Sequence, residues 1–189
     1  MMQMQYYHNV MELREMNMGK SLREKLSGGD LRSIGEANLV IGDIKNQSEF
    51  DILFQYLYDN ERLIVMRAAD AIEKISLTHS EYLYSHKIDI INLCSSATDI
   101  ELKWHLALLI SRPSLLVSEQ TIAFNILKKW AINPKESRIV RVNAIQSLYE
   151  LSKQNSSFKT GFSSIINIVQ EENIASIDAR IRKILTSEV

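Results

Sequence analysis

The sequence predicts an all-α protein, an α-α superhelix (solenoid) made of four to five stacked helical hairpins. Alanines recur at steps of 34, 36, 37 and 35 residues, at Ala37, Ala71, Ala107, Ala144 and Ala179. Glycine and proline, which interrupt helices, number only 6 and 2 among the 189 residues. A period of this length is typical of helix pairs that stack on one another, so the two observations together indicate a helical repeat protein.

The stretch 59–78, DNERLIVMRAADAIEKISLT, is the most complete copy of the repeat. It is predicted to form one helix, and its segment 67–72 returns in weaker form around the other alanines. A small residue is needed at Ala71 because a long side chain would hold the helix away from its neighbour. A second helix fits between each pair of alanines, so each repeat contains two helices.

The first residues are predicted to close one end of the array. Residues 1–18 carry six of the seven methionines and are expected to form a helix that caps the open end, as terminal repeats must. A short helix over 19–27 ends at the glycine pair 28–29, and Asp30 caps a helix over 31–44.

Two further helices flank the reference helix. Asn46 and Glu49 have the spacing of a capping box, which predicts a helix over 46–58. Ser80 is expected to cap another helix that runs to about residue 97. Apolar residues at three-and-four spacing are predicted to lie in the core: Phe50, Leu53, Phe54, Leu57, Leu83, Ile90, Ile91 and Leu93.

The middle of the chain shows the same alternation of caps and helices. Thr98 and Glu101 are expected to form a capping box for a helix over 100–111, which Pro113 stops. A helix over 118–132 follows. One of its faces is apolar and is predicted to be buried, with Ile122, Ile126, Leu127 and Trp130.

The last third is predicted to contain three helices. The segment Asn133-Pro134-Lys135-Glu136 combines a cap, a proline suited to the first helical position and a first-turn carboxylate, so a helix should start at Pro134 and run to about Lys153. Later helices cover about 156–170 and 175–186. All connections are short, and no linker divides the chain, so we expect a single domain over residues 1–189.

This pattern resembles the HEAT and armadillo class of α-helical repeats over about residues 20–187. The residues that carry the resemblance are Asp59, Ala68, Ala69, Ala71 and Ile72, then Asp99, Ala107 and Leu108, then Val142, Ala144 and Ile145. The family's valine-arginine pair is displaced, since Ile64-Val65 stand in its place and the arginine comes later, as Arg67. The resemblance implies a right-handed solenoid of HEAT-like hairpins that acts as a non-enzymatic interaction scaffold.

Composition gives little support to a membrane, nucleic-acid or secreted protein. The net charge is −1, no apolar run reaches the roughly 20 residues of a membrane span, and the N-terminus lacks the pattern of a signal peptide. Cys94 is the only cysteine, which excludes an intramolecular disulfide. We therefore predict a cytoplasmic protein with a protein or peptide partner and no cofactor, nucleic acid or membrane.

No residues stand at the spacing of a known catalytic or metal site. The four histidines do not pair four residues apart, Cys94 lies among apolar residues and is expected to be a buried, inert thiol, and Glu171-Glu172 should be solvated at a helix end. Trp104 is expected to pack in the core near Ala107. We therefore predict no metal site and no enzyme activity.

A stripe of residues on the repeated helices is the predicted partner-binding surface. Positions four before, one before and three after each alanine share one side of a helix, and this stripe has charged ends and an apolar middle, as interfaces often do. Its assigned residues are Arg67, Asp70, Lys74, Lys103, Leu106, Ile110, Asn143 and Ser147. The alternative is that neighbouring helices cover the middle and that Arg67 only pairs with an adjacent repeat.

Other functions stay open at this stage. Some helical-repeat proteins are lyase-like or DNA-glycosylase-like enzymes, which would need a carboxylate of raised pKa beside aromatic residues in a cleft. A nucleic-acid-binding protein would need a basic groove. Homodimerisation through the exposed end of the array is a further alternative.

Overall fold

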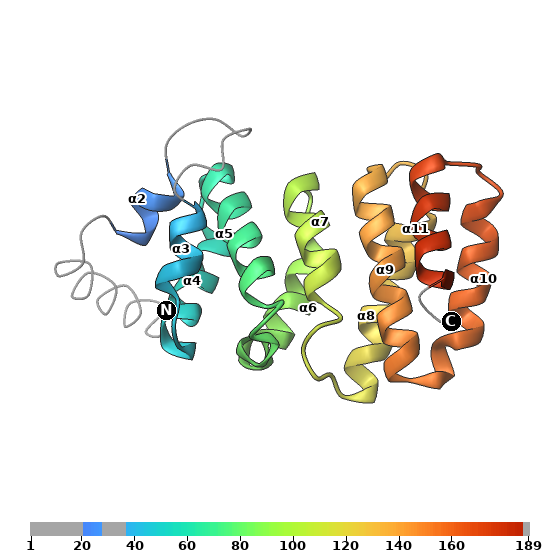
Figure 1. Ribbon diagram of the computed structural model, residues 1–189, viewed down its shortest axis with the longest axis horizontal. Coiled ribbons are helices and arrows are strands. Elements are labelled where there is room, and N and C mark those ends of the chain that lie inside the picture. The colour runs from blue at the N-terminus through green and yellow to red at the C-terminus, as the bar shows by residue number, and fades with distance from the viewer. Residues whose placement is uncertain (1–20, 28–36, 187–189) are drawn as a thin grey trace. The chain divides into compact units, whose positions relative to one another are not determined.

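The computed structural model describes residues 21–27 and 37–186, and this described part is helical without any strand. Figure 1 draws the helices of this part, which falls into two compact units that divide between Tyr82 and Leu83. The predicted helix over 1–18, the glycine pair at 28–29 and the cap at Asp30 lie outside the described residues. The prediction of an all-α repeat fold is confirmed, whereas the single domain and the right-handed superhelix stay predictions.

Unit 1 is built around one long helix. Its elements are α2 (Leu22–Leu26), α3 (Ala37–Asp43), α4 (Gln47–Gln55), the 3-10 helix η1 (Tyr56–Tyr58) and α5 (Arg62–Ile75). α5 packs against α4, η1, α3 and α2. The side chains predicted to be buried from α4 and η1 all lie in the core, because their three-and-four spacing places them on the face that meets α5.

Unit 2 consists of three consecutive hairpins in two rows. After η2 (Ser80–His86), which crosses the division, come α6 (Lys87–Ser96), α7 (Ile100–Leu109), α8 (Val117–Ile132), α9 (Arg138–Gln154), η3 (Ser156–Phe158), α10 (Lys159–Gln170) and α11 (Ala175–Thr186). The first helices α6, α8 and α10 pack along one row, and the second helices α7, α9 and α11 pack along the other. This arrangement is the stacked-hairpin pattern that the alanine period predicted.

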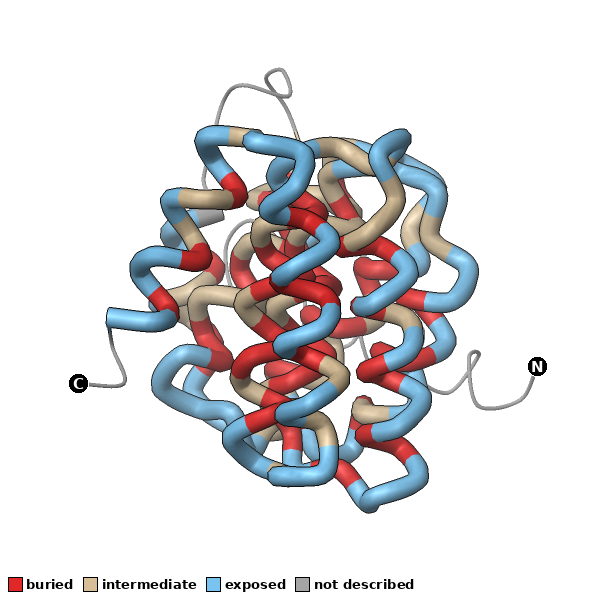
Figure 2. Tube along the Cα trace, turned by 90° about the vertical axis from the view of Figure 1, so that its right-hand side faces the viewer, coloured by how far each residue is buried: buried red, intermediate tan, exposed pale blue. Residues whose placement is uncertain are grey.

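Three of the recurring alanines lie at contacts between helices. Ala71, Ala107 and Ala144 have no exposed surface, which confirms the reason given for their recurrence. Ala179 is different, because it is exposed while Ile177 and Ile181 of the same helix are buried. The exposed and buried positions alternate around each helix in the view from the C-terminal side (Figure 2).

Two predicted helix starts and one predicted cap are wrong. α6 begins at Lys87, because Ser80 opens the 3-10 segment η2 instead of an α-helix. The capping box of Thr98 does not form, since Asp99 is the N-cap residue of α7. The proline segment forms a turn in which Asn133 Oδ1 accepts the Lys135 N–H at 3.0 Å, so α9 starts only at Arg138.

Two local predictions also change in detail. Asn46 caps α4 by accepting the Glu49 N–H, but the Glu49 carboxylate accepts the Lys45 N–H at 2.7 Å, so the reciprocal capping box is incomplete. Ile122 is 49% exposed, because α8 turns Ala123 and Phe124 toward the core instead.

Candidate partner-binding surface

Most of the predicted stripe is buried. Asp70, Lys74 and Lys103 keep partial exposure, whereas the other five residues are buried: Arg67, Leu106, Ile110, Asn143 and Ser147. A buried side chain cannot touch a partner unless the repeat rearranges. The apolar middle of the stripe is therefore covered by neighbouring helices, as the alternative interpretation expected, and the assignment to partner binding stays a prediction for the exposed residues.

The exposed part of the stripe in unit 1 is an ion pair on α5. Lys74 Nζ lies 2.6 Å from Asp70 Oδ2, one helical turn away, and the two side chains are 41% and 30% exposed. Four-residue spacing places the two groups on the same face of the helix. Both charges are therefore available to a partner that approaches α5.

The polar stripe residues of unit 2 connect one repeat to the next. Asn143 Nδ2 donates to the Trp104 carbonyl at 2.9 Å, and Ser111 Oγ donates to Ser147 Oγ at 3.0 Å. Lys103 Nζ lies 2.7 Å from Glu136 Oε1 in the turn before α9. Each contact joins residues one repeat length apart, so these groups hold α7 and α9 in a fixed register.

A buried arginine that the sequence analysis missed holds the last two hairpins together. Arg141, 1% exposed, donates through Nε to the Ala131 carbonyl at 2.9 Å and through Nη1 and Nη2 to both Glu172 oxygens at 2.8 and 2.6 Å. The two-point geometry matches a planar guanidinium to a planar carboxylate. An arginine within an otherwise apolar helix face was the signal that could have found it.

The pair Glu171-Glu172 is predicted from the sequence to be solvated at a helix end. This prediction is wrong for Glu172, because its carboxylate binds Arg141. Its hydrogen bonds with Arg141 lower the pKa of its carboxyl group below the ordinary value, since they favour the charged form. The next residue, Asn173, has a φ of 52°, a left-handed conformation that asparagine tolerates better than most residues. This turn brings the Glu172 carboxylate within reach of Arg141 on α9.

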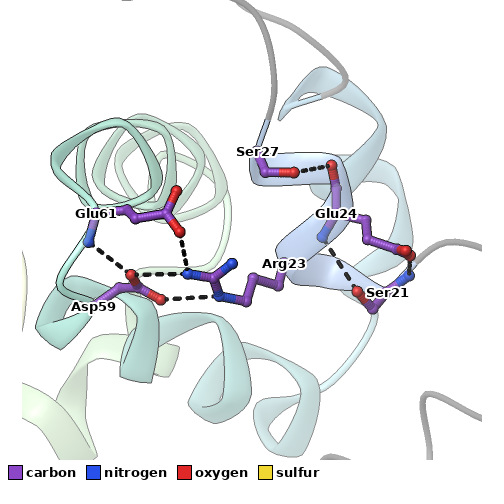
Figure 3. Close-up of polar contacts among 6 residues, drawn as sticks. All are labelled: Ser21, Arg23, Glu24, Ser27, Asp59 and Glu61. Carbon is purple, nitrogen blue, oxygen red and sulfur yellow. Dashed lines mark hydrogen bonds and ion pairs between the residues drawn. The ribbon is translucent and has the colours of Figure 1, made fainter.

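In unit 1 the buried arginine binds a short helix. Arg67, 2% exposed, donates through Nη1 to the carbonyls of Leu26 and Ser27, both at 2.8 Å, at the C-terminal end of α2. The N-terminal half of α2 is held by Arg23, which lies 3.4 Å from Asp59 and 2.6 Å from Glu61 (Figure 3). The interaction of Arg67 thus includes backbone acceptors that the sequence could not identify.

The remaining chemistry-bearing side chains have structural surroundings. Cys94 is buried, with its sulfur 3.8 Å from the Leu106 carbonyl, and burial raises the pKa of the thiol well above its ordinary value, which confirms the inert thiol. Trp104 is half-buried, edge-on to His105. Among the described residues, hydrogen bonds to the carboxylates lower the pKa of Glu81, Glu119 and Glu172.

Two kinds of feature are absent from the described ranges. Within 21–27 and 37–186, no group of three or more histidine, cysteine, aspartate or glutamate side chains is placed to hold a metal ion. Among the helices of the same ranges, none has the length and apolar character needed to cross a membrane.

Comparison with known proteins identifies the repeat class. The family model of the HEAT repeat domain matches residues 18–188. Neither the curated proteins nor the solved structures contain a match to the chain. The family match covers the hairpins of both units, from α2 to the end of α11, and agrees with the buried alanines and the two rows of helices. The chain therefore belongs to the HEAT repeat family.

Proposed function

We propose that the protein is a non-enzymatic interaction scaffold that binds a peptide or protein along the surface of its helical repeats. The observation that carries this proposal is the set of polar contacts between repeats in unit 2. Asn143 with Trp104, Ser111 with Ser147 and Arg141 with Glu172 each join consecutive hairpins. Contacts of this kind keep a surface in one shape before a partner arrives, which reduces the entropy lost on binding.

The exposed stripe residues Asp70, Lys74 and Lys103 are the proposed contact residues. Leu106, Ile110, Asn143 and Ser147 would then act by holding the helices in place, and Arg67 by holding α2. Large apolar side chains are also exposed on unit 2, among them Leu116 and Val117 at the start of α8. Exposed apolar side chains suit a protein partner better than a nucleic acid.

A charge exchange on α5 tests the contact residues without removing their ion pair. The double variant Asp70→Lys with Lys74→Asp keeps opposite charges four residues apart, so the helix should stay folded. Tagged full-length wild-type and variant chains would be used to capture partners from the native cell. We expect a specific partner to be captured by the wild type and lost from the variant; equal capture would contradict the role of these two residues.

The same preparation separates the scaffold from its alternatives. A chain that captures no protein at all would contradict the scaffold proposal. Retention on heparin at low salt, weakening steeply as salt rises, would favour the nucleic-acid alternative. The enzyme alternative predicts a carboxyl group of raised pKa beside aromatic residues, whereas hydrogen bonds lower the pKa of Glu81, Glu119 and Glu172.

A further inference from the structure

We propose that the surface beneath α2 is a docking site for a short basic helix of a partner protein, and that α2 is the chain's own occupant of this site. The inference rests on the proposed scaffold function and names the site and the class of partner. The ligand it describes is a helical turn with the pattern basic–x–basic–leucine that ends directly after the leucine.

The packing of α2 differs from that of a first helix in a repeat. In unit 2, the first helices α6 and α8 pack against the first helices of the following hairpins, α8 and α10. α2 instead packs against α3 and α5, two helices that themselves lie side by side (Figure 1). A short helix that lies across two neighbouring helices uses the packing that a helical ligand makes in a groove.

The length of α2 indicates that packing on the site stabilises the helix. α2 has five residues, and isolated helices shorter than about 12–15 residues are marginal in water. Leu26 is fully buried, while Arg23 and Lys25 reach outward to carboxylates of unit 1. The recognition elements are therefore a pocket for one leucine and an acidic rim.

Charge complementarity specifies the rest of the ligand. Lys25 Nζ lies 2.7 Å from Asp43 Oδ2, and Arg23 Nη2 lies 2.6 Å from Glu61 Oε1, with Asp59 beside it (Figure 3). Residues 37–82, which form the rest of the described unit, carry eight acidic and four basic side chains. A basic segment is therefore attracted to this surface, and an acidic one is repelled.

Arg67 adds a requirement that the helix ends at the site. The last carbonyls of a helix lack partners within the helix. Arg67 Nη1 donates to two of them, those of Leu26 and Ser27, from a buried position. A continuous longer helix would use these carbonyls for its own hydrogen bonds, so the site selects a helix that stops there.

Fluorescence anisotropy with a labelled peptide tests the proposal on the full-length chain. The probe has the sequence of residues 20–29, KSLREKLSGG. In the wild type, α2 competes at the high effective concentration of a tethered segment. In the variant Arg23→Glu with Lys25→Glu, α2 is repelled by the acidic rim. We expect this variant to bind the probe at least tenfold more tightly than the wild type does.

Matched controls separate the docking site from a general charge effect. The variant Lys128→Glu with Lys129→Glu makes the same charge change on the exposed surface of α8 and should bind the probe as weakly as the wild type. Probes with the change Leu26→Ala, or with Arg23→Glu and Lys25→Glu, should lose at least tenfold in affinity for the released variant. Equal binding of all probes, or no binding of the unmodified probe, would overturn the proposal.

Two further outcomes remain decisive. If the released variant is unstable, the unmodified probe should raise its melting temperature in a concentration-dependent manner, and a constant melting temperature would count against the site. If the wild type is a dimer that the probe converts to monomers, the occupant is a second copy and the partner assignment fails. Loss of probe binding with partners still captured through Asp70 and Lys74 would leave the scaffold proposal standing.

Discussion

Unit 1 and unit 2 each bury one arginine in a repeated helix, and the two arginines bind different parts of the chain. Arg141 of α9 connects the end of α8 with the turn before α11, so its contacts lie within and between repeats. Arg67 of α5 donates to the end of α2, a five-residue segment. Similar buried cations therefore fix the register of the array in one unit and hold a short segment on the array in the other.

The comparison can be tested separately for each unit because both tryptophans, Trp104 and Trp130, lie in unit 2. Tryptophan fluorescence therefore reports the unfolding of unit 2, while far-ultraviolet circular dichroism reports the helices of both units. Coincident transitions by the two probes would support the single domain predicted from the sequence. Separate transitions would show that the units unfold independently.

The largest expected effect is the removal of a buried guanidinium. Losing one partner of a buried ion pair lowers the free energy of unfolding by about 3–5 kcal/mol. We expect the loss in Arg141→Ala to lie near the lower limit of this range, because Glu172 can regain water. Urea unfolding followed by tryptophan fluorescence would measure this loss. Arg67→Ala should mainly shift the unfolding transition that circular dichroism reports. An equal shift of the fluorescence transition would contradict a role of Arg67 confined to unit 1.

Enlarging a contact alanine should have the next largest effect. Ala144→Leu, and Ala71→Leu in unit 1, place a larger side chain between packed helices. Each should lower the free energy of unfolding by about 1–3 kcal/mol. Ala179→Leu is the matched control, because Ala179 is exposed and surface substitutions usually change stability by less than about 0.5 kcal/mol. Equal losses at Ala144 and Ala179 would contradict the close-approach explanation.

A pH dependence should appear in unit 2 through Glu172. Its pKa is lowered in the folded state, so its stabilising contribution is complete above the ordinary carboxyl pKa of about 4.5 and is lost as the pH falls through the lower folded-state pKa. The variant Glu172→Gln should lose less stability than the wild type between about pH 6 and pH 3. The carbonyl acceptors of Arg67 do not titrate, so these bonds add no such dependence in unit 1.

The smallest expected effect compares one helical glycine from each unit. A Cβ added at Gly42 of α3 meets nothing within 4 Å, so Gly42→Ala should stabilise unit 1 by about 0.5–1 kcal/mol. A Cβ at Gly161 of α10 would lie 3.2 Å from Phe124 Cζ, and that ring stacks on Phe158. Gly161→Ala should therefore gain less or be destabilising. Thermal unfolding would measure the difference, and equal gains would show that the ring can move away.

Much of the helical pattern could be predicted because its causes are local. The three-and-four spacing of Phe50, Leu53 and Phe54 requires only one helix, and these residues are buried as expected. The start of α9 could not be predicted in the same way. Asn133 and Ser137 can both cap a helix, and Glu136 between them pairs with Lys103, more than thirty residues away.

The candidate site was less predictable than the fold for a related reason. The helical stripe correctly grouped Asp70 with Lys74, since their spacing alone brings them together. It could not show that Asn143 and Ser147 face α7 and its C-terminal end instead of solvent. Exposure depends on the neighbouring hairpin, whose position is not encoded in the periodicity of one helix.

The sequence by itself determined the helical class, the period of the repeat and the small residues at the contacts between helices, because these depend on local spacing and on close approach. Only the tertiary structure decided which buried charges meet. Arg67 and Arg141 occupy similar positions in their helices. Arg67 nevertheless donates to backbone carbonyls, whereas Arg141 donates to a carboxylate. A guanidinium binds whichever acceptors packing brings within about 3 Å, and packing joins residues that are a whole repeat apart.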